Sequence, residues 1–324
     1  METRRLGNTE IRVSEISLGG VAFTHLSKKR SEKLIDFCVE NGINYVDVYS
    51  GTAEKIKDAL KRHRDRIFIS TRGNSKTIEN CLREFGIDYF DIFLLSMVDS
   101  QEHLTQAVNE AEKLEEFRKQ GKFRILGIAT HNPSLYPEII KSNTFQVMMI
   151  PLNCIDEIEQ SILKDAAEKG IGIIAMKPLA GGNIRKYDSA IRYVLNRPVS
   201  TALIGISKVS EARQNLRAVK NLKITEEDLE FFKKIRKQLG KIFCRYCGHC
   251  IFPEPCPREI PVRTIMMLET LAYQSNLRRT VSEKTLKSVE KCAKCGLCEE
   301  RCPYKLPIRK LLPKKVKKYL EMTR

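Results

Sequence analysis

The sequence predicts an α/β protein: a (β/α)8 TIM barrel with an N-terminal β-hairpin, followed by a small, mostly α-helical region. Three observations predict this arrangement. Apolar, strand-like runs alternate with amphipathic helical segments over the first 240 residues, and there are eight such runs. The N-terminus alternates polar and apolar residues in the manner of a strand pair. Eight of the eleven cysteines lie beyond residue 240, in segments that are otherwise compatible with helices.

The eight runs are continuous apolar stretches, which is typical of parallel strands covered on both faces. Amphipathic segments such as 31–42, 54–65 and 115–121 lie between them. Eight strand–helix units in succession favour a closed barrel, whose function-bearing residues lie at the C-terminal ends of the strands. The runs cover residues 16–20, 43–49, 66–73, 89–97, 123–130, 145–153, 171–182 and 201–207.

Composition and charge restrict the functional classes. With 42% hydrophobic and 30% charged residues, the chain is expected to be globular. It has no apolar run long enough for a membrane helix and no signal-peptide pattern at its start, so we expect a cytoplasmic protein without a membrane partner. The formal charge of +17 is compatible with an acidic protein partner, a phosphorylated ligand or a merely solvated Lys/Glu-rich surface. No RNP motif or zinc finger is present, which argues against nucleic acid.

Two cysteine motifs carry the strongest chemical signal. One has the spacing C-x2-C-x2-C-x3-C followed by proline, and the other repeats it with two extra residues before the last cysteine. This is the spacing of bacterial ferredoxins, in which thiolates hold [4Fe–4S] clusters. A disulfide framework is not expected in a chain of this size without a secretory signal, and zinc usually takes two C-x2-C pairs. The motifs comprise Cys292, Cys295, Cys298 and Cys302, and Cys244, Cys247, Cys250 and Cys256.

Ligand pairing follows from the rule for two-cluster ferredoxins, where the fourth cysteine of each run binds the other cluster. We therefore predict two clusters, with their ligands exchanged at the fourth position. Counting the cluster ligands lowers the net charge to about +13. The predicted sets are Cys244, Cys247, Cys250 and Cys302 on one cluster, and Cys292, Cys295, Cys298 and Cys256 on the other.

The chain is expected to divide at residue 240, into a barrel at 1–240 and a cluster-binding helical domain at 241–324. The sequence between the two motifs and the tail after the second are compatible with helices. The tail is rich in lysine. These lysines either solvate the last helix or form a docking surface for an acidic electron-carrier protein.

The first 220 residues resemble the aldo/keto reductase family. The opening RRLGNTEIRVSEISLGG is similar to the hairpin that closes the barrel floor in that family. GINYVDVY, FGIDYFDIFLL, GKFRILGIATHN and AMKPLAGG follow in the family's order and spacing. The last two resemble most the branch whose barrel is fused to a two-cluster C-terminal domain. The resemblance thus implies an oxidoreductase and covers the whole chain.

The resemblance also assigns catalytic positions, several of which are changed here. The family's tyrosine proton donor is tuned by a lysine and an aspartate, because a neighbouring ammonium lowers the pKa of a phenol. Asp47 matches the aspartate, either as a catalytic group or as an ion-pair partner of Arg72. The tyrosine position is Thr52, which leaves Tyr49 as the nearby phenol. Arg72 stands at the lysine position and Ser96 at the histidine position.

Other strand-end residues are candidates for ligand contacts. His131 is either a general acid or a residue that caps its loop, and Lys177 is either an anion contact or an exposed loop residue. Gly181 and Gly182 either offer amides to a phosphate or allow a turn with positive φ. The nicotinamide-stacking glutamine of the family is Met149. The candidate cofactor-binding residues are Asn153, Lys177, Gly205, Ser207, Lys208 and Asn215.

Three functions are compatible with these residues. The first is an oxidoreductase whose barrel binds a small organic substrate or NADP(H), with electrons relayed by two [4Fe–4S] clusters. Because clusters pass single electrons and nicotinamide passes a hydride, a flavin between them is not excluded. The second is a non-catalytic electron-transfer or scaffold protein that has lost carbonyl reduction. The third is an NADPH-dependent carbonyl reductase that works with an arginine.

Overall fold

The computed structural model describes residues 1–156, 158, 160–251, 254–275 and 277–324. A closed barrel of eight parallel strands, β3 to β10, forms its larger part, as predicted. Each strand pairs with the next one along the chain, and β10 closes the ring against β3. The strands are β3 Ile16–Gly19, β4 Tyr45–Asp47, β5 Phe68–Arg72, β6 Phe90–Leu95, β7 Phe123–Ala129, β8 Val147–Pro151, β9 Gly172–Met176 and β10 Thr201–Ile204.

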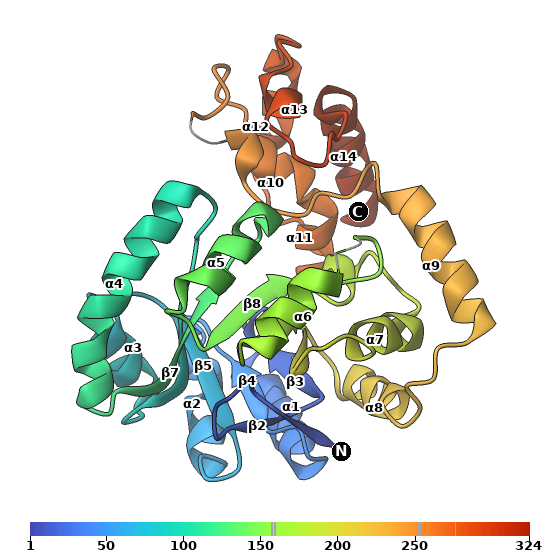
Figure 1. Cartoon of the computed structure of the whole chain (residues 1–324). Helices are drawn as coiled ribbons and strands as arrows, with labels where there is room; N and C mark the ends of the chain where they lie inside the picture. The colour runs from blue at the N-terminus through green and yellow to red at the C-terminus, as the bar shows by residue number, and fades with distance from the viewer. Residues whose placement is uncertain (157, 159, 252–253, 276) are drawn as a thin grey trace.

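Helices cover the outside of this barrel (Figure 1). Most follow a strand directly, and this gives the βα repeat that the sequence predicts. Short 3-10 turns lie at Gly20–Thr24, Pro133–Leu135 and Ala180–Gly182. The helices are α1 Lys28–Glu40, α2 Ala53–Arg62, α3 Ile78–Phe85, α4 Gln101–Lys119, α5 Tyr136–Ser142, α6 Gln160–Glu168, α7 Tyr187–Leu195, α8 Val209–Ala218 and α9 Glu226–Leu239.

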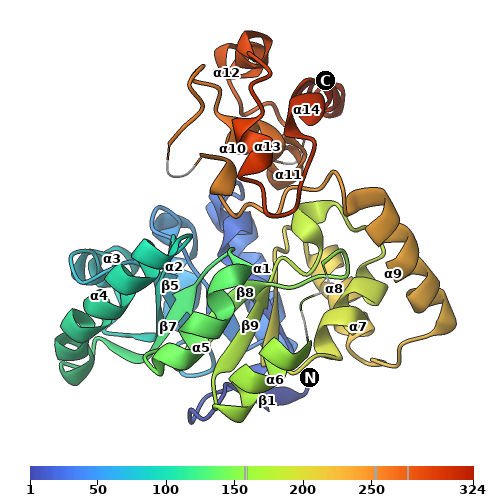
Figure 2. The ribbon, with the colours of Figure 1, turned by 45° about the horizontal axis from the view of Figure 1, so that its top comes forward.

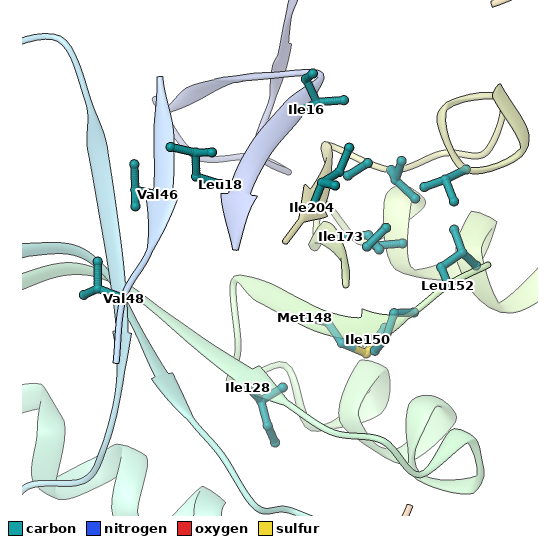
Figure 3. Close-up of a cluster of buried hydrophobic side chains, with 14 of the residues drawn as sticks. Ile16, Leu18, Val46, Val48, Ile128, Met148, Ile150, Leu152, Ile173 and Ile204 are labelled. Carbon is teal, nitrogen blue, oxygen red and sulfur yellow. The ribbon is translucent and has the colours of Figure 1, made fainter. Parts of the chain in front are cut away.

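The period of two along the strands separates two buried layers. Val46 and Val48 point outward and join the large cluster between sheet and helices, part of which is shown in Figure 3. Tyr45, between outward-facing neighbours, belongs instead to the cluster inside the barrel. Asp47 and Tyr49 therefore continue the inward-facing row toward the C-terminal end of the barrel.

An N-terminal hairpin closes the barrel floor. It pairs β1 Thr3–Arg5 antiparallel with β2 Arg12–Ser14. Leu6, Ile11 and Val13 pack into the same cluster as the inward-facing barrel residues. This end of the barrel is thereby filled with apolar side chains.

A C-terminal helical region, residues 241–324, sits over the opposite end of the barrel (Figure 2). It has a hydrophobic cluster of its own, which includes Ile265, Leu268 and Tyr319. Phe243 and Tyr246, by contrast, pack into the barrel's outer cluster, and the division at residue 240 stays a prediction. The helices of this region are α10 Val262–Met266, α11 Leu268–Gln274, α12 Glu283–Lys287, α13 Leu297–Glu300 and α14 Ile308–Met322, with 3-10 turns at His249–Ile251 and Ser288–Lys291.

Helix α9 leads the chain from the barrel to this region along the outside of the molecule (Figure 1). Arg192 of α7 holds it through two hydrogen bonds of 2.8 Å to Asp228. Among the helices described, none is both long enough and apolar enough to cross a membrane.

Candidate active site

A cavity of about 370 Å³ lies between the barrel mouth and helix α11. Its volume is in the range of small-molecule sites in proteins. The barrel and the C-terminal helical region both contribute walls. Its lining includes seven of the sequence-predicted residues, Asp47, Tyr49, Arg72, Lys177, Gly205, Ser207 and Asn215, together with Met267, Thr270 and Tyr273 of the C-terminal helical region.

Asp47 and Arg72 form a buried ion pair at the bottom of this cavity. Arg72 Nη2 donates to Asp47 Oδ2 at 2.8 Å, and the side chains are 16% and 0% exposed. Ser70 donates to the other carboxylate oxygen at 2.7 Å, and Tyr45 in turn donates to Ser70. Burial raises the pKa of the Asp47 carboxyl, and Arg72 and Ser70 oppose this rise. Of the two roles considered for Asp47, the geometry thus shows the ion pair.

The surroundings of Tyr49 disfavour release of its phenol proton. Its ring lies 4.6 Å from the guanidinium carbon of Arg72, and the Asp47 carboxylate is close by. Burial and the Asp47 carboxylate raise the pKa of the phenol well above its usual value. Thr52, at the tyrosine position of the family, is buried, and its hydroxyl donates to the Tyr49 carbonyl at 2.6 Å. A proton donor of the family's kind is therefore not assembled here.

Two further positions of the family's site also differ. Ser96 directly follows β6 and is half-buried, but it is not among the residues that line the cavity. Met149, at the glutamine position, is fully buried and its sulfur accepts a hydrogen bond from Arg72 Nη2 at 3.0 Å. Arg72 therefore bridges Asp47 and Met149 inside the barrel.

Lys177 connects the cavity to the C-terminal helical region. It follows β9 with a φ of +57° and lines the cavity. Its Nζ lies 2.8 Å from Nε2 of His131 and 3.8 Å from the centre of the Tyr246 ring. Burial lowers the pKa of Lys177 to about 7, and burial and Lys177 hold the pKa of His131 well below its usual value. His131 itself does not line the cavity, so it contacts this site through Lys177.

Of the two roles predicted for Gly181 and Gly182, the structure shows the turn with positive φ, and the phosphate contact stays a prediction. Their φ angles are +63° and +92°, which favours glycine. A Cβ on Gly181 would lie 2.7 Å from the Thr270 hydroxyl, and one on Gly182 would lie 3.1 Å from the Tyr273 ring. The loop after β9 therefore requires glycine both for its turn and for the close packing of α11. Both glycines also line the cavity.

The first turn of α8 borders the cavity on its other side. Glu211 accepts hydrogen bonds from the backbone N–H groups of Ser207 at 2.8 Å and Lys208 at 3.2 Å. These are amides that a phosphate at a helix N-terminus would use. Lys208 is exposed and does not line the cavity. Asn153 also lies outside it, where its side chain accepts from the Ile155 N–H.

The cysteines of the two motifs gather in two groups in the C-terminal helical region. In the first group, the thiols of Cys247 and Cys250 interact electrostatically with Cys244 and Cys302, and burial raises their pKa to about 11 and about 12. The second group lines a small cavity that Cys250 borders as well. Its members are Cys256, Cys292, Cys295 and Cys298.

This donor set fits [4Fe–4S] clusters. Each thiolate of a cubane binds a different iron, so the four sulfurs stand further apart than around one ion. Accordingly, no three His, Cys, Asp or Glu side chains in the described part of the chain are arranged to hold a single metal ion. Which cysteine binds which cluster stays a prediction.

Comparison with known families agrees with this architecture. The model of the aldo/keto reductase family matches residues 15–189, which is more than half of the chain. The chain belongs to the aldo/keto reductase family. A 4Fe-4S dicluster domain matches residues 243–307. The protein is thus an aldo/keto reductase-type oxidoreductase with a dicluster domain at its C-terminal end.

Individual relatives of this aldo/keto reductase are distant. An uncharacterized oxidoreductase of Bacillus subtilis, YqkF, is 22% identical over 74% of this chain and 97% of its own length. L-galactose dehydrogenase of Arabidopsis thaliana is 24% identical over 75% of this chain and 95% of its own length. Among solved structures, an aldo-keto reductase from Bacillus halodurans in its holo form superposes with a TM-score of 0.62 at 20% identity. It covers 72% of this chain and 96% of its own. This last likeness shows the fold.

Sequence reasoning missed the residues that the C-terminal helical region contributes to the site. Thr270 and Tyr273 belong to a short helix whose sequence gives only a helical pattern, and Tyr246 lies between two predicted ligands. Arg185, which donates to Tyr273 Oη at 3.1 Å, was also not singled out. One signal was available: Gly181 and Gly182 are adjacent, and two such glycines often mark a close approach of another segment.

Proposed function

We propose that this protein is an iron–sulfur oxidoreductase in which the cavity binds a small organic substrate or a nicotinamide cofactor and exchanges electrons with two [4Fe–4S] clusters. One observation carries the proposal. Lys177 lines the cavity, its ammonium contacts the Tyr246 ring, and the Tyr246 backbone N–H donates to Cys244 Sγ at 3.4 Å. Contacts between neighbouring residues thus lead from the cavity to the first cysteine group.

The clusters would supply one-electron chemistry when bound by the two predicted cysteine sets. The chain's own residues bind and orient the ligand. Arg185 places positive charge in the cavity wall, Lys177 with its pKa of about 7 can hold or release a proton there, and Arg72 is engaged by Asp47. Tyr273 and Met267 cover the ligand from the C-terminal side and reduce its exposure to water.

For a nicotinamide cofactor, the supporting residues are Gly205 and Asn215, which line the cavity and match the family's adenine-side pattern. Ser207, at a position that is often basic in the family, lines the cavity as well. NADP(H) is the family's usual cofactor, and a flavin remains compatible with the one-electron step. The thiol-rich C-terminal helical region suits a reducing compartment such as the cytoplasm.

A second candidate has its own supporting observation. The raised pKa of Tyr49 beside Asp47 and the position of Ser96 outside the cavity favour a protein without carbonyl reduction, which acts as an electron-transfer or scaffold protein. In that case the cavity has no reacting ligand, and electrons only pass through the clusters.

The test is iron and sulfide analysis of anaerobically prepared protein, followed by EPR of the dithionite-reduced form with and without NADP+. We expect about eight irons per chain and a change in the signal of one centre when NADP+ is present. If the clusters can be reduced but their EPR signals do not change with any cavity ligand tried, the electron-transfer candidate would be favoured. Zinc in place of iron would overturn the proposal.

A further inference from the structure

Positive charge is concentrated in the C-terminal helical region. Residues 241–324 contain nineteen Lys and Arg against eight Asp and Glu, so they carry +11 of the chain's +17. Two clusters with their eight thiolates would lower the value for this region to about +7. A region about a quarter of the chain in length thus carries most of the net charge, which favours an anionic partner.

The second cysteine group, Cys256, Cys292, Cys295 and Cys298, is the one that reaches the surface. Cys295 is exposed, and Lys294 beside it is exposed as well. The first group is more enclosed, since Cys247 and Cys302 are buried. A protein partner can therefore approach the second group more closely than the first.

Helix α14 begins next to this exposed group. Arg309 in its first turn donates through Nη1 to the Lys294 carbonyl at 3.0 Å, and Leu312 lines the same small cavity as the cysteines. Arg309 also forms an ion pair with Glu299 at 2.7 Å. In Figure 1, α13 lies at the end of the region away from the barrel, and α14 lies beside it.

One face of α14 presents lysines to solvent. Lys310, Lys314 and Lys317 are exposed, and their spacing of four and three places them on one side of the helix. The part of the chain that the structure describes provides no acidic partner for them within ion-pair distance. Lys315 and Lys318 differ, because both bind Glu269. The first three lysines, with Lys294, are called the lysine face below.

We propose that the lysine face is the docking surface for an acidic one-electron carrier protein. This rests on the proposed function. The carrier gives up one electron to the centre held by the second cysteine group, and no bond or proton changes place. Electron-transfer complexes are small and transient, so long-range charge attraction rather than apolar burial sets their rate of formation. From there, electrons continue to the enclosed first group and to the cavity.

The experiment uses the holoprotein and a reduced, acidic plant-type [2Fe–2S] ferredoxin as the probe. Stopped-flow absorbance gives the second-order rate of electron transfer at low and high salt. The test variant carries Lys310→Glu, Lys314→Glu and Lys317→Glu. A matched control carries Lys233→Glu, Lys234→Glu and Lys237→Glu on α9, which are exposed lysines outside the C-terminal helical region.

We expect the α14 variant to slow electron transfer at low salt at least about tenfold, the control to change it much less, and salt to slow the wild type. Reduction by methyl viologen radical, which needs no protein docking, stays equal in all three, as do the EPR signals. Equal rates for wild type and α14 variant, or equal slowing in the control, would overturn the docking surface. A wild type whose centres methyl viologen cannot reduce would instead count against the proposed function.

Discussion

At the scale of single residues, the bottom of the cavity is defined by the ion pair of Asp47 and Arg72. Arg72 pairs with Asp47, while burial and the Asp47 carboxylate raise the pKa of the Tyr49 phenol. The arginine also cannot share its proton at neutral pH, as a lysine does. Asp47 and Arg72 therefore contribute to positioning and stability.

Replacing Arg72 tests this interpretation. Arg72→Met leaves the Asp47 carboxylate buried without its cation, and we expect it to lower the free energy of unfolding by about 3–5 kcal/mol. Arg72→Lys keeps a positive charge, so its free energy of unfolding should fall less. Urea unfolding followed by circular dichroism measures both. Equal stability of the two variants would show that the charge is not what Asp47 requires.

The position of Glu211 leads to a prediction about the relative affinity for NADP(H) and NAD(H). Its carboxylate already occupies the Ser207 and Lys208 amides, where it would repel the additional phosphate of NADP(H). Glu211→Gln should strengthen binding of NADP(H) relative to NAD(H) by about fivefold, or ~1 kcal/mol. Fluorescence titration of both nucleotides measures this ratio, with Glu226→Gln on α9 as the control. An unchanged ratio of the two affinities would mean that the additional phosphate of NADP(H) does not bind near Glu211.

At the scale of elements, the loop after β9 and helix α11 form one unit. The positive-φ turn at Gly181 and Gly182 lets Thr270 and Tyr273 approach the backbone and complete the cavity. Lys177 precedes this turn and contacts Tyr246, so the same loop reaches both the ligand and the first cysteine group.

A methyl group added at Gly181 should disturb the packing of the loop after β9 against α11. In Gly181→Ala, the new Cβ would lie 2.7 Å from Thr270 Oγ1 in a backbone conformation that alanine rarely adopts. We expect α11 to separate from the loop at a cost of about 1–3 kcal/mol. Limited proteolysis of the C-terminal helical region should become faster. Gly205→Ala is the matched control, because its Cβ would meet nothing within 4 Å, and similar proteolysis of both variants would contradict the account.

The barrel elements could be predicted from sequence because each depends on a local pattern. All eight apolar runs contain strands, and the opening hairpin lies where alternation predicts it. The two cysteine groups follow from spacing alone. The contacts between Lys177 and His131, and between Gly181 and Thr270, join residues far apart in the chain. No local periodicity encodes such pairs, so the wall that α11 adds to the cavity could not be predicted.

At the scale of the whole molecule, two cores are joined at the barrel mouth. The barrel has its own inner and outer clusters, whereas the core of the C-terminal helical region is small and includes cysteines of both groups. A small core of this kind depends strongly on bound metal for its stability. The stability of the barrel should not depend on bound metal.

Removal of iron should therefore unfold the C-terminal helical region before the barrel. After anaerobic chelation, we expect amide hydrogen exchange in residues 254–275 and 277–324 to rise by more than about tenfold, while the barrel strands keep their protection. Mass spectrometry of peptic fragments measures this. Loss of protection over the barrel as well would show that the two cores fold as one.

If the cavity and the clusters form one redox unit, NADPH added anaerobically to the iron-loaded protein should reduce the clusters. Visible and EPR spectra report cluster reduction within the same sample. The account predicts reduction by NADPH or NADH, with slower reduction in Gly181→Ala, where the contact between loop and α11 is disturbed. Clusters that dithionite reduces but neither nucleotide does would contradict the nicotinamide form of the proposal and favour the second candidate, in which electrons only pass through the clusters.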